Sequence, residues 1–274
     1  MTEQSIVLRD FYQIRLYHVK GELNPSSWSW QKEPHSHDHM ELAVHIAGNM
    51  DILAEGNLYR HYGGEIRLYA SGELHCGILH TKQNMEWYQL MIPLDFLNCK
   101  DGKALSGIFF ERAFGEGNVI YSKRYEEIVR IFQNIFELYE TREPLFECYC
   151  RSALVNLLCL VKLGGNRKKA DIRKDSALQK ILNLICTEYC ELTTVREIAE
   201  RTHFSVSYIN KIFREQLCIS PYQFLLCKKF NEAKRALKEG KNVTEACQIA
   251  GFHDYSNFIT AFRRRFGVTP NRYV

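Results

Sequence analysis

Three features that mark other classes of protein are missing from this sequence. It contains no run of eighteen apolar residues, so no segment is suited to cross a membrane as a helix. The first residues, MTEQSIVLRD, lack the basic start and apolar core of a secretion signal. The ten cysteines include no Cys-x-x-Cys pair, and in a reducing compartment such cysteines are expected to be buried and unbridged. We therefore expect a cytoplasmic protein without membrane segments, disulfides or a cysteine metal site.

Charge is distributed unevenly along the 274 residues, a length that is sufficient for two domains. Residues 176–274 carry 15 basic and 9 acidic side chains, whereas residues 1–165 carry 16 basic and 21 acidic ones. The content of 46% hydrophobic and 25% charged residues is that of an ordinary globular protein. A basic C-terminal part joined to a mildly acidic N-terminal part favours a module that binds a polyanion.

The basic part contains one pattern that occurs twice, at 194–224 and at 242–273. Each copy opens with a capping-box signature, in which a capping residue at 194 or 242 is followed by glutamate three positions later. A short apolar pair, a turn and a second helix follow. The apolar stripes of the two second helices are Ile209, Ile212, Phe213 and Leu217, and Phe258, Ala261, Phe262 and Phe266. Each copy ends on a capping residue and a proline, which predicts a further helix at Pro221 and at Pro270.

The string from Gly251 to Pro270 resembles the signature of the DNA-binding domain of AraC/XylS-family transcription regulators. The resemblance covers about the last hundred residues. It implies two helix-turn-helix motifs joined by a helix around 230–237, in a domain that binds double-stranded DNA. A rigid joining helix would set the two second helices about 34 Å apart, one turn of DNA. Lys229 stands where that family usually has arginine.

The resemblance also implies which side chains meet DNA. Those on the exposed face of each second helix would read bases, because asparagine suits adenine and lysine suits guanine. The base-reading candidates are Ser207, Asn210, Lys211, Ser256, Asn257 and Thr260. Arginines beside them would contact phosphates, which adds affinity but little sequence information. These candidates are Arg214, Arg263, Arg264 and Arg265.

The two copies differ where the second helix ends. The second copy has Gly267 there, and glycine takes the left-handed conformation without steric cost. The first copy has Cys218 at the matching position, and the helix start at Ser220 and Pro221 follows so closely that the turn cannot be relaxed. We therefore expect Cys218 either in a strained left-handed conformation or in a slightly different turn.

Residues 6–92 have the pattern of an all-β barrel or sandwich. Short β-branched or aromatic segments are interrupted by glycines, and they cover 14–19, 40–46, 50–54, 57–62, 65–70, 73–79 and 86–92. A pattern H-x-H-x3-E-x6-G from His35, and a later one G-x5-A-x-G-x2-H from Gly64, resemble the two motifs of the cupin barrel. Ser29 and Ala70 replace the glycine and the proline that this resemblance leads one to expect.

The cupin resemblance assigns the family's metal-ligand positions to His35, His37, Glu41 and His75. Three imidazoles and a carboxylate would suit a divalent transition metal, whereas regulators of the resembling type usually bind organic effectors without one. We therefore expect these four residues to line a pocket for a small-molecule effector, such as a carbohydrate or a related metabolite, with no metal or other cofactor. His39 and His45 have no role in either motif and are expected to be surface or core residues.

After residue 122 the apolar period becomes that of helices. A helix from Ser122 to Tyr139 and another from Pro144 to Leu163 are predicted to lie antiparallel, because the loop between them is short. Two apolar stripes exceed what one face of a barrel needs, so we expect the helices of 122–163 to form a homodimer interface. Covering the barrel is the alternative. The segment 164–175, two glycines and a run of charges, is typical of a solvated linker.

The sequence thus predicts an α+β protein of two domains. Residues 1–163 form a cupin-like β-barrel with a helical hairpin, and residues 176–274 form an all-α domain with two helix-turn-helix motifs joined by a helix. We expect a regulator, not an enzyme, that binds specific DNA and responds to an effector. Two alternatives stay open: a metal-dependent cupin enzyme with a DNA-binding appendage, and a dimeric regulator that needs no ligand.

Overall fold

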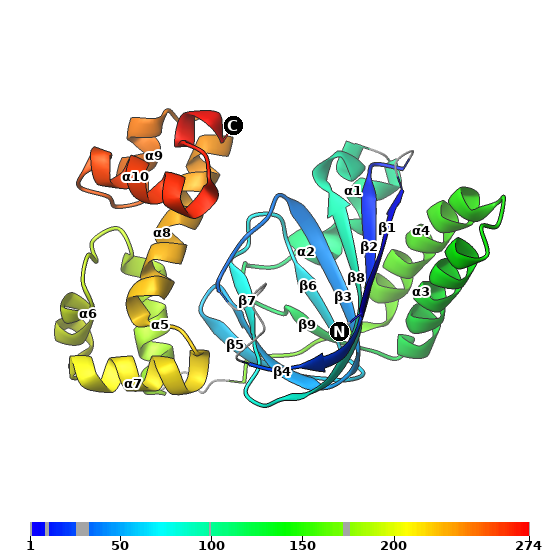
Figure 1. Cartoon of the computed structure of the whole chain (residues 1–274), viewed down its shortest axis with the longest axis horizontal. Helices are drawn as coiled ribbons and strands as arrows, with labels where there is room; N and C mark the ends of the chain where they lie inside the picture. The colour runs from blue at the N-terminus through cyan, green and yellow to red at the C-terminus, as the bar shows by residue number, and fades with distance from the viewer. Residues whose placement is uncertain (1, 9–10, 26–32, 99, 172–175, 274) are drawn as a thin grey trace.

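The computed structural model describes residues 2–8, 11–25, 33–98, 100–171 and 176–273 (Figure 1). Ser29 and residues 172–175 of the expected linker lie outside the described residues. In the described part of the chain, no helix combines the length and the apolar character that crossing a membrane requires.

The N-terminal part is built from two sheets. The larger has the order β1-β2-β8-β3-β6-β9-β10 and the smaller β5-β4-β7. The strands are β1 (Thr2–Leu8), β2 (Ile14–Leu23), β3 (His39–Ala47), β4 (Asn49–Ala54), β5 (Asn57–Tyr62), β6 (Ile66–Tyr69), β7 (His75–Ile78), β8 (Gln83–Pro93), β9 (Val119–Ser122) and β10 (Gly165–Arg167). All seven predicted strands are present, whereas β1, β9, β10 and the short helices η1 (Leu94–Asn98), α1 (Lys100–Leu105) and α2 (Gly107–Phe110) were not predicted.

The strand ladders do not show whether the predicted cupin-like β-barrel closes. Within the described residues, β3 pairs with β6 and β8, while β4 pairs with β5 and β7, so the ladders define two separate sheets. The chain passes from one sheet to the other at Gly48, which has φ +88°. A side chain there would also collide with Met85, because an added Cβ would lie 2.2 Å from its sulfur. Glycine therefore permits the sharp turn that separates the sheets.

Alternation along the strands divides the apolar residues into layers. In β3 one set, Met40, Leu42 and Val44, packs against the helices α3 (Tyr125–Glu140) and α4 (Phe146–Gly164). The other set points between the sheets, where Ala43 belongs to a second core. The outer side of the smaller sheet contributes to a third core, which it shares with the C-terminal helices. Figure 1 shows α3 and α4 on one side of the sheets and the C-terminal domain on the other.

The helices α3 and α4 lie side by side as predicted, but the first begins later than expected. Ser122 ends β9 instead of capping a helix, and its Oγ accepts a hydrogen bond from the backbone N–H of Arg124 at 3.1 Å. Most apolar residues of both helices are buried against the larger sheet and each other, whereas Tyr139 and Leu163 are exposed. Most of the expected surplus of apolar surface, on which the homodimer prediction depended, is therefore used within one chain.

The basic segment after α4 is not a solvated tether in its described part. Residues Gly165–Arg167 form β10, which pairs with β9 at the edge of the larger sheet. Arg167 donates hydrogen bonds to the carbonyls of Gly117 at 2.9 Å and Ile108 at 2.7 Å. Lys168 pairs with the carboxylate of Glu65 at 3.1 Å. The charges that suggested a linker thus attach the segment to the sheet.

The C-terminal domain contains two helix pairs with a long helix between them. The first pair is α6 (Val195–Thr202) and α7 (Val206–Leu217), and the second is α9 (Val243–Ile249) and α10 (Tyr255–Phe266). Helix α5 (Ala177–Glu188) precedes them, and α8 (Pro221–Lys238) connects them. The capping boxes at Thr194 and Asn242 are confirmed. The helix predicted at Pro270 is only a 3-10 turn, η2 (Pro270–Arg272).

Cys218 adopts the left-handed conformation, with φ 58°, at the same helix-end position as Gly267, with φ 75°. We predict that Cys218→Gly raises the free energy of unfolding by a few tenths to about 1 kcal/mol, because it removes steric strain but adds freedom to the unfolded chain. Urea unfolding of the full chain measures the change. As a control, Gly267→Ala should lower stability, although nothing lies within 4 Å of the added Cβ. A lower midpoint for Cys218→Gly would contradict the strain.

Candidate functional site

The second helices of the two pairs present matching exposed faces. In α7 the buried stripe consists of Ile209, Ile212, Phe213 and Leu217, which turns the opposite side of the helix to solvent. Ser207 and Ser256 occupy the same place, the second residue of α7 and of α10, and both are exposed. Lys211 and Thr260 are exposed as well. The predicted base-reading side chains therefore lie on two equivalent surfaces.

The two asparagines on these surfaces make hydrogen bonds within their own helices. Nδ2 of Asn210 donates to the carbonyl of Val206 at 2.9 Å, and Nδ2 of Asn257 donates to Asp254 at 3.0 Å. Asp254 also caps α10 through the backbone N–H of Asn257. To bind an adenine through both the nitrogen and the oxygen of its side-chain amide, each asparagine would exchange its local hydrogen bond for one to the base.

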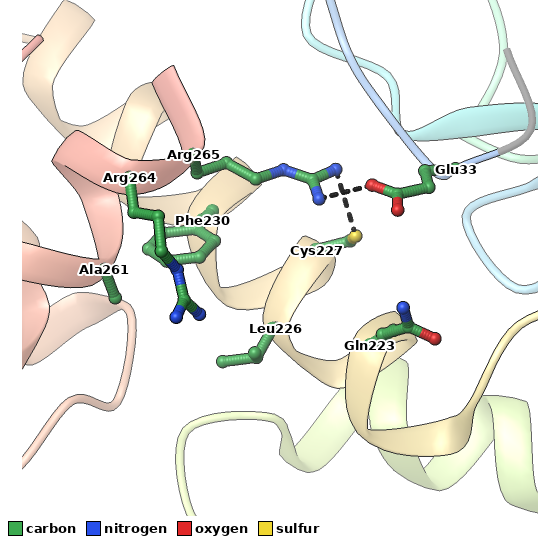
Figure 2. Close-up of a pocket in the computed structure, with 8 residues that line it drawn as sticks. All are labelled: Glu33, Gln223, Leu226, Cys227, Phe230, Ala261, Arg264 and Arg265. Atoms are coloured by element: carbon green, nitrogen blue, oxygen red, sulfur yellow. Dashed lines mark hydrogen bonds and ion pairs between the residues drawn. The ribbon is translucent and has the colours of Figure 1, made fainter. Parts of the chain in front are cut away.

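The four predicted phosphate contacts separate into two groups. Arg214, Arg263 and Arg264 are exposed and have no ion pair among the described residues. Arg265 instead pairs with Glu33 of the sheet domain at 2.6 Å and donates to the carbonyl of Pro34 at 3.3 Å. Figure 2 shows this pair across the domain boundary. Arg265 is therefore still exposed, but it pairs with the sheet domain.

A groove runs between the helix pairs on either side of Arg264. One part, of about 550 Å³, is lined by Gln223, Cys227 and Phe230 of α8 and by Arg264 and Arg265. The other, of about 470 Å³, includes Arg264 with residues of the α9–α10 turn. Figure 2 shows the guanidinium of Arg264 reaching into this groove over Leu226. The groove therefore places a positive charge between the two exposed helix faces.

The turn of the second pair is attached to α8 through Lys229. Its Nζ donates to the carbonyl of Gly251 at 2.6 Å and lies 5.4 Å from the centre of the Phe252 ring. Gly251 has φ +69°, and an added Cβ would lie 2.4 Å from the backbone of Cys190. Lys229 thus attaches α8 to the turn between α9 and α10, and this turn requires glycine at position 251.

Helix α8 also meets the sheet domain through buried charges. Nζ of Lys228 lies 2.7 Å from Glu55, in the turn after β4, and 2.8 Å from Glu232 on its own helix. Burial acts to lower the pKa of Lys228, but the two carboxylates outweigh burial and raise it. Arg235 supplies a second cation to Glu232 at 2.5 Å. A lysine between two acids therefore connects the DNA-binding helices to the sheets.

Further along α8, polar side chains hold the loops that carry the predicted pocket. Ser36 donates to the side chain of Asn231, which in turn donates to the carbonyl of Gly72 at 3.0 Å. Lys234 donates to the carbonyl of Ser36 at 2.9 Å. Ser36 lies between His35 and His37. The loop that carries these two histidines, here called the histidine loop, is therefore in direct contact with α8, the helix that joins the two helix pairs.

The four predicted pocket residues come together beside this loop. Nε2 of His37 lies 3.0 Å from Glu41, and Nε2 of His75 lies 4.0 Å from the same carboxylate oxygen. One ligand atom from each of these three residues lies within 4.8 Å of the others. The ring of His35 is 4.6 Å from that of His75. Burial acts to raise the pKa of Glu41, but the hydrogen bond and charge of His37, with the charges of His75 and Arg67, lower it.

The donor set fits a metal ion when the second ring nitrogen of each histidine is considered. Nδ1 of His35, His37 and His75 each lies 2.9 Å from a backbone carbonyl. A carbonyl only accepts, so each Nδ1 carries the proton and Nε2 of the neutral ring offers a lone pair. Metal-binding histidines are oriented in this way. Nε2 of His37 faces a carboxylate oxygen of Glu41, and two lone pairs repel each other. Either a cation between the two atoms or a proton on Nε2 is therefore needed.

Sequence reasoning missed a second polar group, deeper between the sheets. Arg67, Gln89, His45 and His61 are each at most 1% exposed and share the inward side of their strands. The sequence did contain a signal for His45. An even number of positions separates it from Glu41 in β3, so strand alternation places both side chains on the same side of the sheet. The cupin-like motifs drew attention to the histidines at the edge and away from these residues.

Two family models match this chain. One, described as an AraC-like ligand binding domain, matches residues 25–182. The other, described as a helix-turn-helix domain, matches residues 198–274. The first match ends at residue 182, inside α5, and so extends into the C-terminal domain of the structure, whereas the second begins at residue 198, inside α6.

Curated proteins similar to this chain carry names of transcription regulators. The probable transcriptional regulator LumQ of Photobacterium leiognathi is 31% identical over 138 residues, which are 49% of this chain and 55% of LumQ. The uncharacterized HTH-type regulator YdiP of Escherichia coli K12 is 28% identical over 261 residues, covering 89% of this chain and 81% of YdiP. The chain thus spans about half of the length of LumQ and most of that of YdiP.

Solved structures are similar over one domain or over both. The C-terminal domain of the response regulator yesN from Fusobacterium nucleatum has 28% identity and a TM-score of 0.33, covering 34% of this chain and 92% of that one. ToxT from Vibrio cholerae has 11% identity and a TM-score of 0.36, covering 97% of each chain.

The buried position of Lys228 leads to a prediction on domain docking. Lys228→Met should destabilise the full chain by about 3–5 kcal/mol, because Glu55 and Glu232 would lose their shared cation. The double variant with Glu55→Gln should cost less than the two single changes added together, by more than about 1 kcal/mol. Thermal unfolding measures both. Arg196→Met breaks an exposed pair with Glu200 and should cost under about 1 kcal/mol. If the double variant costs as much stability as the two single changes added together, Glu55 and Lys228 are not energetically coupled.

Proposed function

We propose, from the premise that this chain belongs to the AraC/XylS family of transcription regulators, that it binds specific double-stranded DNA and responds to a small-molecule effector held by its sheet domain. The two helix pairs act as helix-turn-helix units, and α8 keeps them at a fixed spacing. Each unit inserts its second helix, α7 or α10, into one major groove.

One observation carries the DNA-binding part of this proposal. The exposed faces of α7 and α10 carry polar side chains at equivalent positions: Ser207 matches Ser256, and Arg214 matches Arg263. Arg264 lies in the groove between the units. A charge between two base-reading surfaces would meet the phosphates of the DNA backbone that separates two successive major grooves.

The effector acts through the contacts between α8 and the sheet domain. An effector changes an equilibrium only by the difference in its affinity for the two states. Lys228, Asn231 and Lys234 bind to loops beside the predicted pocket. An effector that repositions these loops would change how α8 docks, and so whether Arg265 is available to phosphate.

We also propose that the chain forms a homodimer, through a smaller surface than the whole length of the helices in 122–163. The apolar stripes of α3 and α4 are buried, but Tyr139 and Leu145, near the loop between these helices, are 49% and 69% exposed. A contact centred on this end of the helical hairpin would leave the exposed faces of α7 and α10 free.

A metal-dependent protein is the second candidate, and the orientation of the histidines favours it. His37, Glu41 and His75 could hold a divalent cation, with His35 beside them, and the cation would supply Lewis-acid chemistry or a structural link between loops. Without a metal, Glu41 is balanced by its hydrogen bond with His37 and by Arg67, whose Nε lies 3.9 Å from it. We favour the metal-free form, because this balance needs no other group.

The DNA-binding proposal predicts different effects for asparagines and arginines. Asn210→Ala and Asn257→Ala should each relax the preference at one or two base pairs, because each removes one base contact. Arg264→Ala should weaken binding to every sequence alike and reduce the salt slope by about 1, because it removes a phosphate contact. Selection from a pool of random duplexes, followed by titration at several salt concentrations, measures both effects. Arg130→Ala, exposed on α3, is the control. Equal recovery of all duplexes would refute the proposal.

The metal-free form predicts the elemental composition of the protein. Full-length protein purified without added metal should contain well under one transition-metal ion per chain. Elemental analysis by mass spectrometry measures this. About one ion per chain, lost in His37→Ala but kept in His39→Ala, would establish the metal-dependent candidate instead. His39 is a suitable control, because its ring stacks on that of His37 at 3.8 Å but is not among the three grouped ligands.

A further inference from the structure

Each of the two exposed helix faces begins with an apolar side chain. Val206 is the first residue of α7 and Tyr255 is the first residue of α10, and they are 40% and 47% exposed. They occupy matching positions, because each directly precedes a serine of the predicted base-reading set, Ser207 or Ser256. Neither Val206 nor Tyr255 belongs to that set. The start of each second helix therefore presents an apolar group beside a polar one.

The fold makes little use of these two side chains. Within the described part of the chain, neither Val206 nor Tyr255 belongs to an apolar core of the C-terminal domain. Other residues cap the two helices, since the side chains of Ser205 and Asp254 accept the hydrogen bonds from the first turns. A single exposed apolar residue is ordinary in a soluble protein. Two at matching positions of two similar helices point to a partner that both helices share.

The first turn of each second helix is the part that would lie nearest the bases. In a helix-turn-helix unit, the N-terminal residues of the second helix contact base edges in the major groove. Val206 lies one helical turn before Asn210, whose Nδ2 donates to the carbonyl of Val206 at 2.9 Å. Residues four positions apart share one side of a helix. Val206 therefore lies beside an asparagine that is suited to adenine.

The major groove offers one apolar group on its base edges, which is the methyl group of thymine. The other groups there are hydrogen-bond donors or acceptors, and a side chain without polar atoms would remove their water without replacing the hydrogen bond. Valine therefore favours thymine over the other bases. The ring of tyrosine can also lie against a methyl group, while its hydroxyl stays in water or bonds to a phosphate.

We infer that Val206 and Tyr255 each select a thymine by packing against its methyl group. The polar side chains beside them read the neighbouring base pairs. Because α8 keeps the two helix pairs about one turn of DNA apart, the two thymines lie about ten base pairs from each other. This inference rests on the proposed binding of specific DNA, and it names a base that the bound sequence contains at two places.

The size of the expected effect follows from the burial of one methyl group. Moving one such group from water into an apolar contact corresponds to about a fourfold change in affinity. Loss of a single methyl group should therefore weaken binding severalfold at one base pair without abolishing it. Loss of a phosphate contact differs, because it weakens binding to all sequences alike.

The test first removes the methyl group from the DNA and leaves the protein unchanged. A duplex that the full chain selects from a random pool is synthesised with each thymidine replaced in turn by deoxyuridine, which lacks only the methyl group. Binding of the full chain to each duplex is then titrated at one salt concentration, because the affinity depends on salt. Replacement should weaken binding about fourfold at two positions that lie about ten base pairs apart.

Protein variants then assign each thymine to a residue. In Val206→Ser the cost of deoxyuridine should disappear at one of the two positions and remain at the other, and Tyr255→Ser should show the reverse. The matched control is Val268→Ser, because Val268 follows the end of α10 and is 38% exposed. This control should keep both costs. All three side chains are exposed, and the deoxyuridine series with the unchanged protein does not depend on how the variants fold.

Two results would overturn the inference while leaving the proposed DNA binding intact. In one, a duplex is selected but no two thymidines at this spacing respond to deoxyuridine. In the other, the costs persist unchanged in Val206→Ser and Tyr255→Ser, and each residue is judged separately by its own position. Failure to select any duplex would instead refute the proposed DNA binding, and the inference with it.

Discussion

The docking of α8 on the sheet domain is the contact on which the rest of this structure depends. Phe224 and Leu225 belong to the core of the first helix pair, while Phe230 and Ala233 belong to that of the second. The polar side of the same helix places Lys228 against Glu55. This ion pair lies beside an apolar core that the smaller sheet shares with the C-terminal helices, so apolar and polar contacts together attach the two domains. Because one helix serves both helix pairs and the interface, neither pair can move relative to the sheets without disturbing the other.

The sequence predicted most elements correctly where local signals were strong. Strand alternation identified seven strands, and the capping boxes at Thr194 and Asn242 identified helix starts, because both signals depend on neighbouring residues only. Prediction from the sequence failed where a residue far away in the chain determines the local structure. Gly165–Arg167 becomes a strand because β9 offers a free edge, and Ser122 ends that strand instead of capping a helix. Closure of the sheets could not be inferred either, since it depends on which strands pair.

The predicted sites show the same limit. The motif brought His35, His37, Glu41 and His75 together, because motif spacing encodes strand register. The exposed faces of α7 and α10 followed from helical periodicity. By contrast, Arg265 was expected at phosphate but pairs with Glu33, which is 232 positions earlier in the chain. The surroundings of Arg67 were also invisible, since only the fold shows that its Nε lies 3.9 Å from Glu41 and has no hydrogen-bond partner among the described residues.

Glu41 links the inner polar group to α8 through a short series of contacts. One carboxylate oxygen faces Arg67 at 3.9 Å, and the other is bonded to His37. His37 adjoins Ser36, whose hydroxyl and carbonyl bind Asn231 and Lys234 of α8. A shift of Arg67 would leave Glu41 more dependent on His37, and α8 is hydrogen-bonded to the loop that carries His37. Coupling of this kind needs an element with two arrangements, and a loop held by polar contacts on both sides is better suited to that role than the packed sheets.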